Sequence, residues 1–402
     1  MNTPPNPPLS TPLRAALEAA GQDRIVFDLA GIEAQYDTLL DELPGIGVRF
    51  AMKACPVDEV LARLAAKGSG FDAASPNEIA QALRTGVPVD RVHYGNTIKS
   101  DENIAAAHRL GVRDFATDSP EDVAAIAAHA PGARVFCRLA TSGEGALWGL
   151  SGKFGCSGDD AVRVMEEARR SGLVPSGLSV HVGSQQMTAD AWRDAVDRLA
   201  GVLASLGRRG IHPDRINLGG GLPAFGYLDS RGDVLDPPVD KIFAVIREGM
   251  EHLRAVSEVP LDFVMEPGRH LVADHGAVRA HVSRLSTRSP DGGAPEHWLY
   301  LSCGKFNGLY EMDQLQYRLH FPTRPGAAGV PAVVAGPTCD SDDAYAHQHN
   351  RVEVPATAAS GDPVWILSSG AYATGYTTRG FNGFDPLPHL CVDDGQRRTE
   401  RP

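Results

Sequence analysis

The feature that most constrains the fold of this 402-residue chain is a repeated alternation of short apolar runs with segments of helical period. The apolar runs occupy residues 48–53, 70–75, 91–96, 114–119, 134–140, 177–184, 215–221 and 261–268. Between them lie segments such as PNEIAQALRTG, for which Ser75 is a predicted N-cap and Gly86 a predicted stop. Strands that alternate with helices form parallel sheets, and eight such units close a (β/α)8 barrel, with an open doubly wound sheet as the structural alternative.

The two ends of the chain lie outside this alternation. Residues 24–29 (RIVFDL) predict a strand, and residues 32–40 predict a helix. After Arg269, runs such as GAVRAHVSRLS and DPVWILSSGAY are typical of β structure with Gly and Pro turns. We therefore predict an α/β fold in which a (β/α)8 barrel is joined to a C-terminal β domain that the N-terminal strand completes. The predicted boundaries are a flexible tail over 1–23, a strand and helix joining the β domain over 24–44, a barrel over 45–275, the β domain over 276–395 and a tail over 396–402.

The charge balance and the cysteines limit the classes of function. The 38 Lys and Arg residues are outnumbered by 50 Asp and Glu residues, so we expect neither a nucleic-acid partner nor binding to an anionic membrane surface. No run approaches about 18 consecutive apolar residues, and the first residues, MNTPPNPPLS, do not resemble a secretory signal. The six cysteines include no CxxC pair, which suits a reducing compartment. We therefore expect a cytoplasmic protein.

Polar and ionisable residues close most of the predicted strands. In barrels of this kind the active site lies at the C-terminal ends of the strands, so these closing residues are candidates for a site. They are Lys53, Asp72, Asn96, Arg138, His181, Gly183, Ser184, Gly219, Gly220, Gly221, Glu266, Gly268 and Arg269. Each one alone is more simply explained as a solvated residue at the end of a strand, but the whole set favours a functional site.

Four features of this set suit a single cofactor. The bare backbone amides of Gly219–Gly221 would cradle a phosphate, and Arg269 supplies a fixed cation after the neighbouring strand. Lys53 has apolar neighbours, where desolvation would favour a neutral amine able to form a Schiff base. Glu266 needs a cationic partner, which a protonated pyridine nitrogen or an internal Arg would provide. Pyridoxal 5'-phosphate carries the phosphate, the carbonyl group and the basic ring nitrogen that these residues suit together.

Seven motifs, in order along the chain, then give a family resemblance. They are AMKACP, GFDAASPNEI, SVHVGS, LGGGLP, EPGR, GPTCDSDD and GAYATGYTTRGFNGF. Together they resemble the ornithine/diaminopimelate decarboxylases, the barrel-type (fold type III) pyridoxal phosphate enzymes. The resemblance implies that Lys53 forms the Schiff base, that His181 stacks on the cofactor ring and that Glu266 holds its nitrogen. It also places at the cofactor Asp72, Arg138, Ser184, Gly219, Gly220, Gly221, Gly268, Arg269 and Tyr372.

The carboxylate expected at the ring nitrogen bears on the reaction. A carboxylate keeps the nitrogen protonated and so strengthens the electron sink that decarboxylation requires. Alanine racemases share the barrel but place an Arg there, which weakens the sink. Glu266 therefore favours decarboxylation over racemisation.

The same resemblance implies a homodimer whose active sites are shared across the interface. Cys339, in GPTCDSDD, would protonate the substrate carbon in the other subunit's site, and Asp340 would contact the substrate side chain. The segment GKFNGLYEMDQLQYRLHFP resembles one in bacterial ornithine/lysine decarboxylases and places Glu311 near the distal end of the substrate, with Tyr372 as a further contact. Two carboxylates would then clamp a side-chain amine. The expected substrate is a basic L-amino acid, L-ornithine or L-lysine, as in polyamine biosynthesis.

Other readings remain open. The family's lysine segment usually ends in Cys-Asn where this chain has Ala54-Cys55, and its glycine loop usually continues with Phe where this chain has Leu222. These changes leave room for meso-diaminopimelate or an unusual diamino acid of a specialised pathway. A non-catalytic binding protein similar to the antizyme inhibitors and a metal-dependent hydrolase are the alternatives from other classes. The hydrolase would use the cluster Asp340, Asp342, Asp343, His347 and His349, although we expect no metal.

Overall fold

The computed structural model describes residues 9–149, 152–289, 292–345, 351–393 and 396–401. The chain divides into two compact units. The barrel unit comprises Gln35–Pro223 and Pro237–Gly268, and the β unit comprises Met1–Ala34, Ala224–Asp236 and Arg269–Pro402. The division falls within helix α2 (Leu29–Glu42), which belongs to both units.

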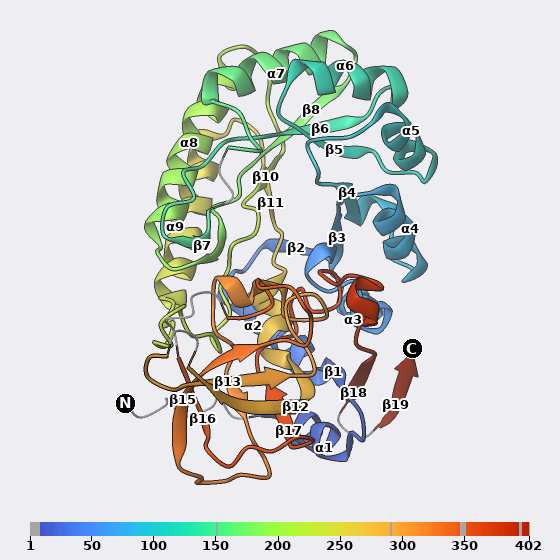
Figure 1. The fold of residues 1–402 in the computed structure, drawn as a ribbon. Coiled ribbons are helices and arrows are strands. Elements are labelled where there is room, and N and C mark those ends of the chain that lie inside the picture. The colour runs from blue at the N-terminus through green and yellow to red at the C-terminus, as the bar shows by residue number, and fades with distance from the viewer. Residues whose placement is uncertain (1–8, 150–151, 290–291, 346–350, 394–395, 402) are drawn as a thin grey trace. The chain divides into compact units, whose positions relative to one another are not determined.

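Within the described residues, the barrel unit is built on a closed ring of eight parallel strands (Figure 1). In ring order they are β10 (Arg215–Asn217), β11 (Asp262–Met265), β2 (Ile46–Ala51), β3 (Gly70–Ala73), β4 (Val92–Tyr94), β5 (Asp114–Thr117), β6 (Arg134–Arg138) and β8 (Val174–Ser179). Each of the eight predicted apolar runs overlaps one of these strands. The predicted (β/α)8 barrel is therefore confirmed, and the open doubly wound sheet is excluded.

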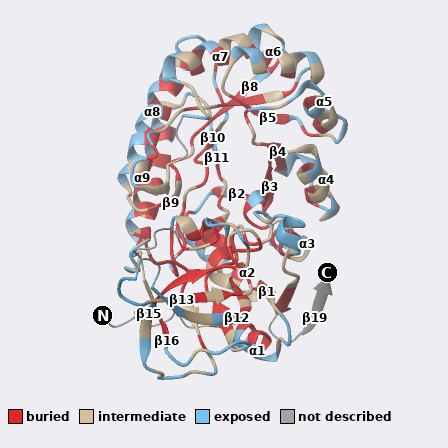
Figure 2. Ribbon diagram, in the orientation of Figure 1, coloured by how far each residue is buried: buried red, intermediate tan, exposed pale blue. Residues whose placement is uncertain are grey.

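Helices follow the strands and surround the ring, with their buried residues turned towards it (Figure 2). They are α3 (Asp58–Ala66), α4 (Pro76–Arg84), α5 (Asp101–Arg109), α6 (Pro120–His129), α7 (Gly158–Arg170), α8 (Asp190–Gly207) and α9 (Val239–Val256). At the start of α4, the Ser75 side chain accepts a hydrogen bond from Glu78 N, and the Glu78 carboxylate accepts one from Ala74 N. Gly86 follows the helix with a positive φ of 84°. Both the predicted cap and the predicted stop are confirmed.

A buried charge cluster lies at the N-terminal ends of the barrel strands. Asp114, the first residue of β5, accepts hydrogen bonds from Arg215 at 2.6 Å and from Arg134 at 3.3 Å, and Arg49 of β2 lies 3.7 Å from the same carboxylate. Burial alone would raise the pKa of Asp114, but the positive charges of Arg215 and Arg49 outweigh burial and lower it. This cluster is at the end of the barrel that serves stability rather than catalysis.

The β unit contains a mixed sheet in which strands from both ends of the chain pair. Its order is β16 (Val352–Pro355), β15 (Gly329–Ala335), β13 (Glu296–Leu301), β12 (Gly276–Arg288), β1 (Arg24–Asp28), β18 (His389–Asp393) and β19 (Gln396–Arg401), while β17 (Pro363–Ile366) pairs with β12 and β14 (Leu319–His320). Strand β1 runs antiparallel to β12 and parallel to β18. The prediction that the N-terminal strand completes the C-terminal β domain is confirmed.

The boundaries differ from the predicted ones in four places, of which one is residues 35–44, predicted to join the β domain but part of the barrel unit. Residues 11–19, placed in a flexible tail, form helix α1 (Thr11–Ala19), because Leu13 and Leu17 pack with Val26, Trp365 and Leu390 in a hydrophobic core. Residues 396–401, predicted as a tail, form β19. Residues 224–236 and 269–275, predicted within the barrel, belong to the β unit because they pack there.

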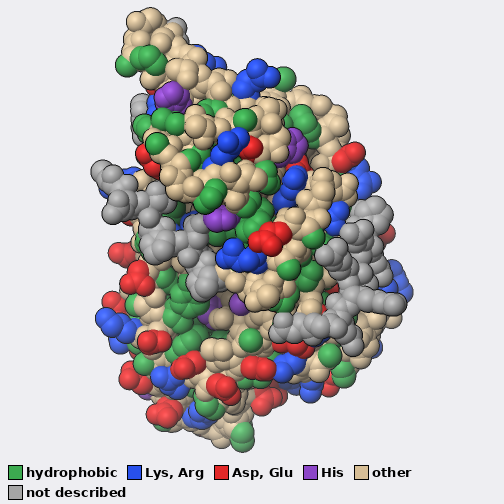
Figure 3. Space-filling view, turned by 90° about the horizontal axis from the view of Figure 1, so that it is seen from below, with side chains coloured by type: hydrophobic (Ala, Val, Ile, Leu, Met, Phe, Trp, Pro, Cys, Tyr) green, Lys and Arg blue, Asp and Glu red, His purple; other side chains and the backbone are tan. Residues whose placement is uncertain are grey.

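Among the described residues, none of the helices is both long enough and apolar enough to cross a membrane. Acidic, basic and hydrophobic side chains are interspersed on the face shown in Figure 3.

Candidate active site

Side chains from several strand ends gather at the C-terminal end of the barrel. Lys53 lies in the short helix η1 (Met52–Ala54) directly after β2, Asp72 lies in β3, Arg138 ends β6, and Glu266 follows β11. Burial by itself would raise the pKa of Asp72, but a hydrogen bond from His93 and the charges of Lys53 and Arg138 lower it. The predicted barrel residues therefore share one electrostatic environment.

Lys53 differs from the prediction in one respect. Its side chain is exposed, so the desolvation expected to favour the neutral amine is not found in this chain. Its environment is instead set by charge, since Asp72, Glu78 and His181 all lie within the electrostatic reach of its ammonium group.

His181 is held as a neutral imidazole. It stands two residues after β8, where Gly183 N donates a hydrogen bond to its Nδ1 at 3.1 Å. Burial lowers the pKa of His181 well below the usual value, and the positive charges of Arg138 and Lys53 lower it further. A neutral ring with Nδ1 as acceptor suits stacking on a flat ligand.

The three glycines after β10 allow backbone to approach where a side chain would not fit. A Cβ on Gly219 would lie 1.9 Å from Val180 O, and a Cβ on Gly220 would lie 2.9 Å from Glu266 O and 3.0 Å from His181 Nε2. Gly219 and Gly221 also have positive φ, of 68° and 117°. Bare amides, a neutral imidazole, a carboxylate and a lysine at one barrel end fit a phosphorylated aromatic aldehyde, and Ser184 begins the adjacent strand β9 (Ser184–Gln186).

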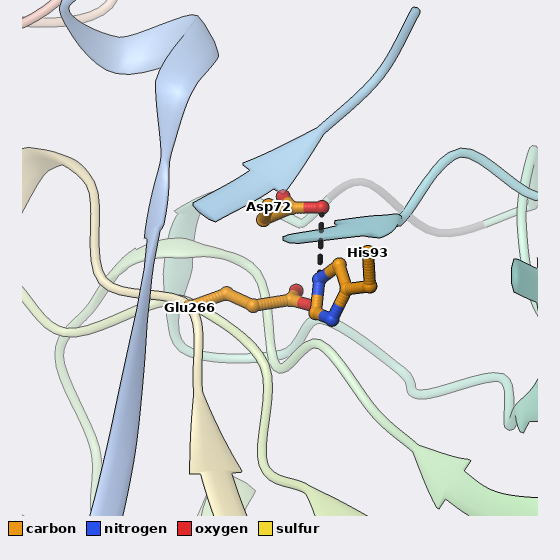
Figure 4. Close-up of side chains that lie close together, drawn as sticks. All are labelled: Asp72, His93 and Glu266. Atoms are coloured by element: carbon orange, nitrogen blue, oxygen red, sulfur yellow. Dashed lines mark hydrogen bonds and ion pairs between the residues drawn. The ribbon is translucent and has the colours of Figure 1, made fainter. Parts of the chain in front are cut away.

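Two residues that the sequence reasoning did not single out contact Glu266. Asn217, at the end of β10, donates from Nδ2 to Glu266 Oε1 at 2.5 Å and accepts from Gly219 N at 2.9 Å. His93, in β4, lies 2.8 Å from the same Oε1 and 3.2 Å from Asp72 Oδ1 (Figure 4). The available signal was weak, a polar residue inside each apolar run, RVHYGN and RINLGGG.

The β unit holds a second cluster of predicted residues. Arg269, which follows Gly268 directly in the chain, donates from both terminal nitrogens to the two oxygens of Glu311, at 2.5 and 2.6 Å, and to the Tyr227 hydroxyl at 3.1 Å. Arg269 and Glu311 are only 4% and 5% exposed. Although burial opposes its charge, Glu311 and Tyr227 raise the pKa of Arg269 well above the usual value. The guanidinium also lies 4.9 Å from the centre of the Tyr372 ring.

This pairing engages one of the two carboxylates predicted to clamp the substrate amine, and the clamp itself stays a prediction. Glu311 is already neutralised by Arg269, so it is not a free anion beside Asp340. Arg269 would likewise bind a phosphate only by dividing its donors between that phosphate and Glu311.

The GPTCDSDD segment separates into exposed and buried parts. Cys339 is exposed, and its backbone N–H donates to Asn382 Oδ1 at 2.7 Å. Asp343 is buried and accepts from Lys305 N, Thr338 N and Thr338 Oγ1. Asp343 therefore has a structural role that competes with metal binding. His347 and His349, which completed the alternative metal cluster, lie outside the described residues.

Most of the barrel unit matches the model of a known protein family. Residues 29–273 match the model of the family described as "Pyridoxal-dependent decarboxylase, pyridoxal binding domain". The chain belongs to this family. The match confirms the expected enzyme class and cofactor, and it spans the strand ends that carry Lys53, His181 and Glu266.

Relatives along the whole chain agree with this assignment. The chain is 30% identical to the lysine/ornithine decarboxylase of Selenomonas ruminantium over 92% of its own length and 89% of that protein. It is 28% identical to the ornithine decarboxylase of Schizosaccharomyces pombe, over 94% and 86%. Its structure resembles that of the Vibrio vulnificus lysine/ornithine decarboxylase complexed with cadaverine, with a TM-score of 0.81, 27% identity and coverage of 94% of this chain and 97% of that one.

Proposed function

We propose that this enzyme uses pyridoxal 5'-phosphate to decarboxylate a basic L-amino acid, L-ornithine or L-lysine, and releases CO2 and a diamine. The observation that carries the chemistry is the Glu266 carboxylate, held through Oε1 at the barrel end that also presents Lys53 and neutral His181. The likeness to lysine/ornithine decarboxylases over nearly the whole chain supports the substrate class.

Each barrel residue has a proposed task. Glu266 offers Oε2 to the ring nitrogen and keeps it protonated, while His181 stacks against the ring. The amides of Gly219–Gly221, together with Ser184 and Gly268, receive the phosphate, and Asp72 and Arg138 fix the charge balance. When bound, the cofactor supplies an electron sink for the pair of electrons that CO2 leaves behind. Lys53 would hold the cofactor's carbonyl group through its side-chain amine.

The proposed assembly is a homodimer in which the partner supplies groups to each site. Cys339 is exposed, as a residue must be that acts outside its own subunit, and it protonates the substrate Cα in this proposal. Exposed aromatic residues of the β unit, Tyr310, Tyr376 and Phe381, support a surface that packs against another protein. Tyr310 and Tyr376 also contact each other, with ring centres 4.6 Å apart.

Asp340 is the proposed selector of the substrate side chain. With Glu311 paired to Arg269, Asp340 is left as the carboxylate that attracts a terminal ammonium group. A second carboxylate on the substrate, as in meso-diaminopimelate, would be repelled by it. Asp340→Asn should therefore weaken selection for ornithine and lysine, which a rise in KM for these substrates measures.

A CO2-release assay tests the function. The cofactor-loaded enzyme is given L-ornithine, L-lysine, L-arginine, meso-diaminopimelate and the corresponding D-amino acids, and we expect turnover with ornithine or lysine. Lys53→Ala is the matched inactive protein and should release no CO2. Turnover of meso-diaminopimelate alone would overturn the assigned substrate, and normal turnover by Lys53→Ala would overturn the assigned lysine.

Subunit mixing tests the shared site. Lys53→Ala and Cys339→Ala place their defects on opposite sides of the proposed interface. In an equal mixture about half of the dimers are mixed, each with one intact site, so activity should recover to about a quarter of the wild-type value. No recovery, with exchange verified by mass spectrometry, would contradict the proposed position of Cys339.

A further inference from the structure

His93 bridges two carboxylates inside the barrel. It belongs to β4 and is only 1% exposed, and its Nε2 lies 2.8 Å from Glu266 Oε1 and 3.2 Å from Asp72 Oδ1. Figure 4 shows Asp72 and Glu266 approaching the imidazole from different directions, and both carboxylates contact the same nitrogen, Nε2. Because carboxylate oxygens accept hydrogen bonds, Nε2 must carry a proton and donate it to them.

The hydrogen bonds from His93 and Asn217 engage only one of the two carboxylate oxygens of Glu266. His93 and Asn217 both donate to Oε1, which fixes the rotation of the carboxylate. Oε2 is then the oxygen of Glu266 that would accept a hydrogen bond from a ring nitrogen held at this barrel end. His93 and Asn217 thus fix the orientation of the Glu266 carboxylate as well as its position.

The charges facing His93 come from four elements of the barrel. Asp72 of β3 and Glu266 after β11 attract a positive imidazole, Arg49 of β2 repels it, and Asp114 of β5 lies within electrostatic reach. The Phe136 ring of β6 packs against the imidazole, with ring centres 5.1 Å apart. Burial and Arg49 lower the pKa of His93, but the hydrogen bonds to Asp72 and Glu266 outweigh them and raise it above the usual value.

We propose that His93 is a positioning residue for Glu266. In the absence of the cofactor His93 is also the internal cation that balances the charges of Asp72 and Glu266, and a protonated pyridine ring takes over that charge when it binds. The inference rests on the proposed placement of the ring at Glu266 and is independent of the substrate. When the ring cation arrives, His93 releases the proton on Nδ1 to solvent and keeps the proton on Nε2 that holds Oε1. Cofactor binding is therefore linked to release of a proton from His93.

This linkage has a definite sign. A proton is released only between the pKa of His93 with the ring bound and its higher pKa without the ring. Because binding releases a proton there, the affinity for the ring increases as pH rises through that window, by up to about tenfold per pH unit for one full proton. Outside the window the contribution of His93 disappears.

The experiment measures binding by calorimetry with the full chain after its cofactor has been removed. The probe is pyridoxine 5'-phosphate, which has the ring and the phosphate but no aldehyde, so it does not bond to Lys53. Titrations at several pH values across about pH 5 to 9, in buffers of different ionisation enthalpy, give both Kd and the number of protons released. Titration of the phosphate itself is common to all variants and cancels in their comparison.

Two variants separate the proton of His93 from its hydrogen bond. His93→Gln places an uncharged N–H where Nε2 lies, so it should bind like the wild type at alkaline pH but release fewer protons near neutral pH. His93→Leu has no donor, so it should lose the same proton release and also bind more weakly at alkaline pH. The matched control is His212→Gln, because His212 of the same unit also pairs with a carboxylate, Glu258 at 3.6 Å, but is exposed. It should not differ from the wild type.

The outcomes distinguish this inference from the proposed function. If His93→Gln releases as many protons as the wild type, His93 is not the balancing cation. If His93→Leu binds as tightly as His93→Gln at alkaline pH, His93 does not position Glu266. If Glu266→Gln changes neither Kd nor proton release, the ring does not lie at Glu266, and the placement in the proposed function fails instead.

Discussion

Two glutamates, one in each unit, are held in opposite ways. Glu266 in the barrel unit receives two hydrogen bonds on a single oxygen, from Asn217 and His93, and its side chain is 14% exposed. Glu311 in the β unit gives both oxygens to Arg269, and its side chain is 6% exposed. The first retains an oxygen that can accept from a ligand, whereas the second has both oxygens engaged by protein.

The difference shows how a carboxylate is kept available for chemistry. A bidentate arginine satisfies the geometry and the charge of a carboxylate at once, which favours a structural role. A histidine divided between two acids satisfies neither acid fully, so a further cation is still attracted. The two arrangements therefore suit the same residue type to stability in one unit and to the proposed function in the other.

The largest effect is expected from breaking the structural pair. Glu311→Leu leaves the Arg269 guanidinium buried without its partner, which should lower the free energy of unfolding by about 3 to 5 kcal/mol. Urea unfolding followed by circular dichroism measures the change. The double variant Arg269→Leu/Glu311→Leu removes both charges and should recover much of the loss. A single variant as stable as the wild type would show that the pair contributes little.

The next effect is expected on catalysis. Glu266→Gln keeps the shape and the Oε1 acceptor but removes the charge, so turnover should fall by about 100-fold to 1000-fold. The free energy of unfolding should change by less than about 1 kcal/mol, because the hydrogen bonds remain possible. Steady-state kinetics and urea unfolding of the same preparation check both parts. A large loss of stability with normal turnover would show that Glu266, like Glu311, has a structural rather than a catalytic role.

A smaller effect concerns acid stability at the opposite end of the barrel. The pKa of Asp114 is lowered in the folded chain, so its contribution to stability is present above the unfolded pKa and is lost as pH falls through that value towards the folded one. Asp114→Asn should lower stability at neutral pH by about 1 to 3 kcal/mol and flatten the acid side of the profile. The measurement is the free energy of unfolding from neutral to acid pH. Parallel pH profiles for the variant and the wild type would contradict the prediction.

The smallest effect is expected at an exposed pair. Lys67 and Asp37 lie 2.7 Å apart with partly exposed side chains, 31% and 51%. Asp37→Asn should change the free energy of unfolding by less than about 1 kcal/mol, and any change should shrink with added salt. A loss comparable with that of Glu311→Leu would show that burial does not explain the difference between these pairs.

Sequence reasoning located most of the barrel because the physical signal there is local. Apolar runs with helical segments between them mark each βα unit, and residues such as Asp72 and Glu266 follow from their place at the strand ends. Helix α1 was missed because its short amphipathic stretch follows a proline-rich start, and only packing against Val26 and Trp365 stabilises it. Its formation depends on a sheet assembled from distant segments.

The sequence alone determined the fold class, the family and the type of residue available at each strand end, since periodicity and ordered motifs are properties of the chain. Only the tertiary structure decided which of these residues pair. It joined Arg269 to Glu311 across 42 positions and brought His93 between Asp72 and Glu266. Pairing depends on distances of a few ångströms between side chains from different elements, and such distances exist only once the elements have packed.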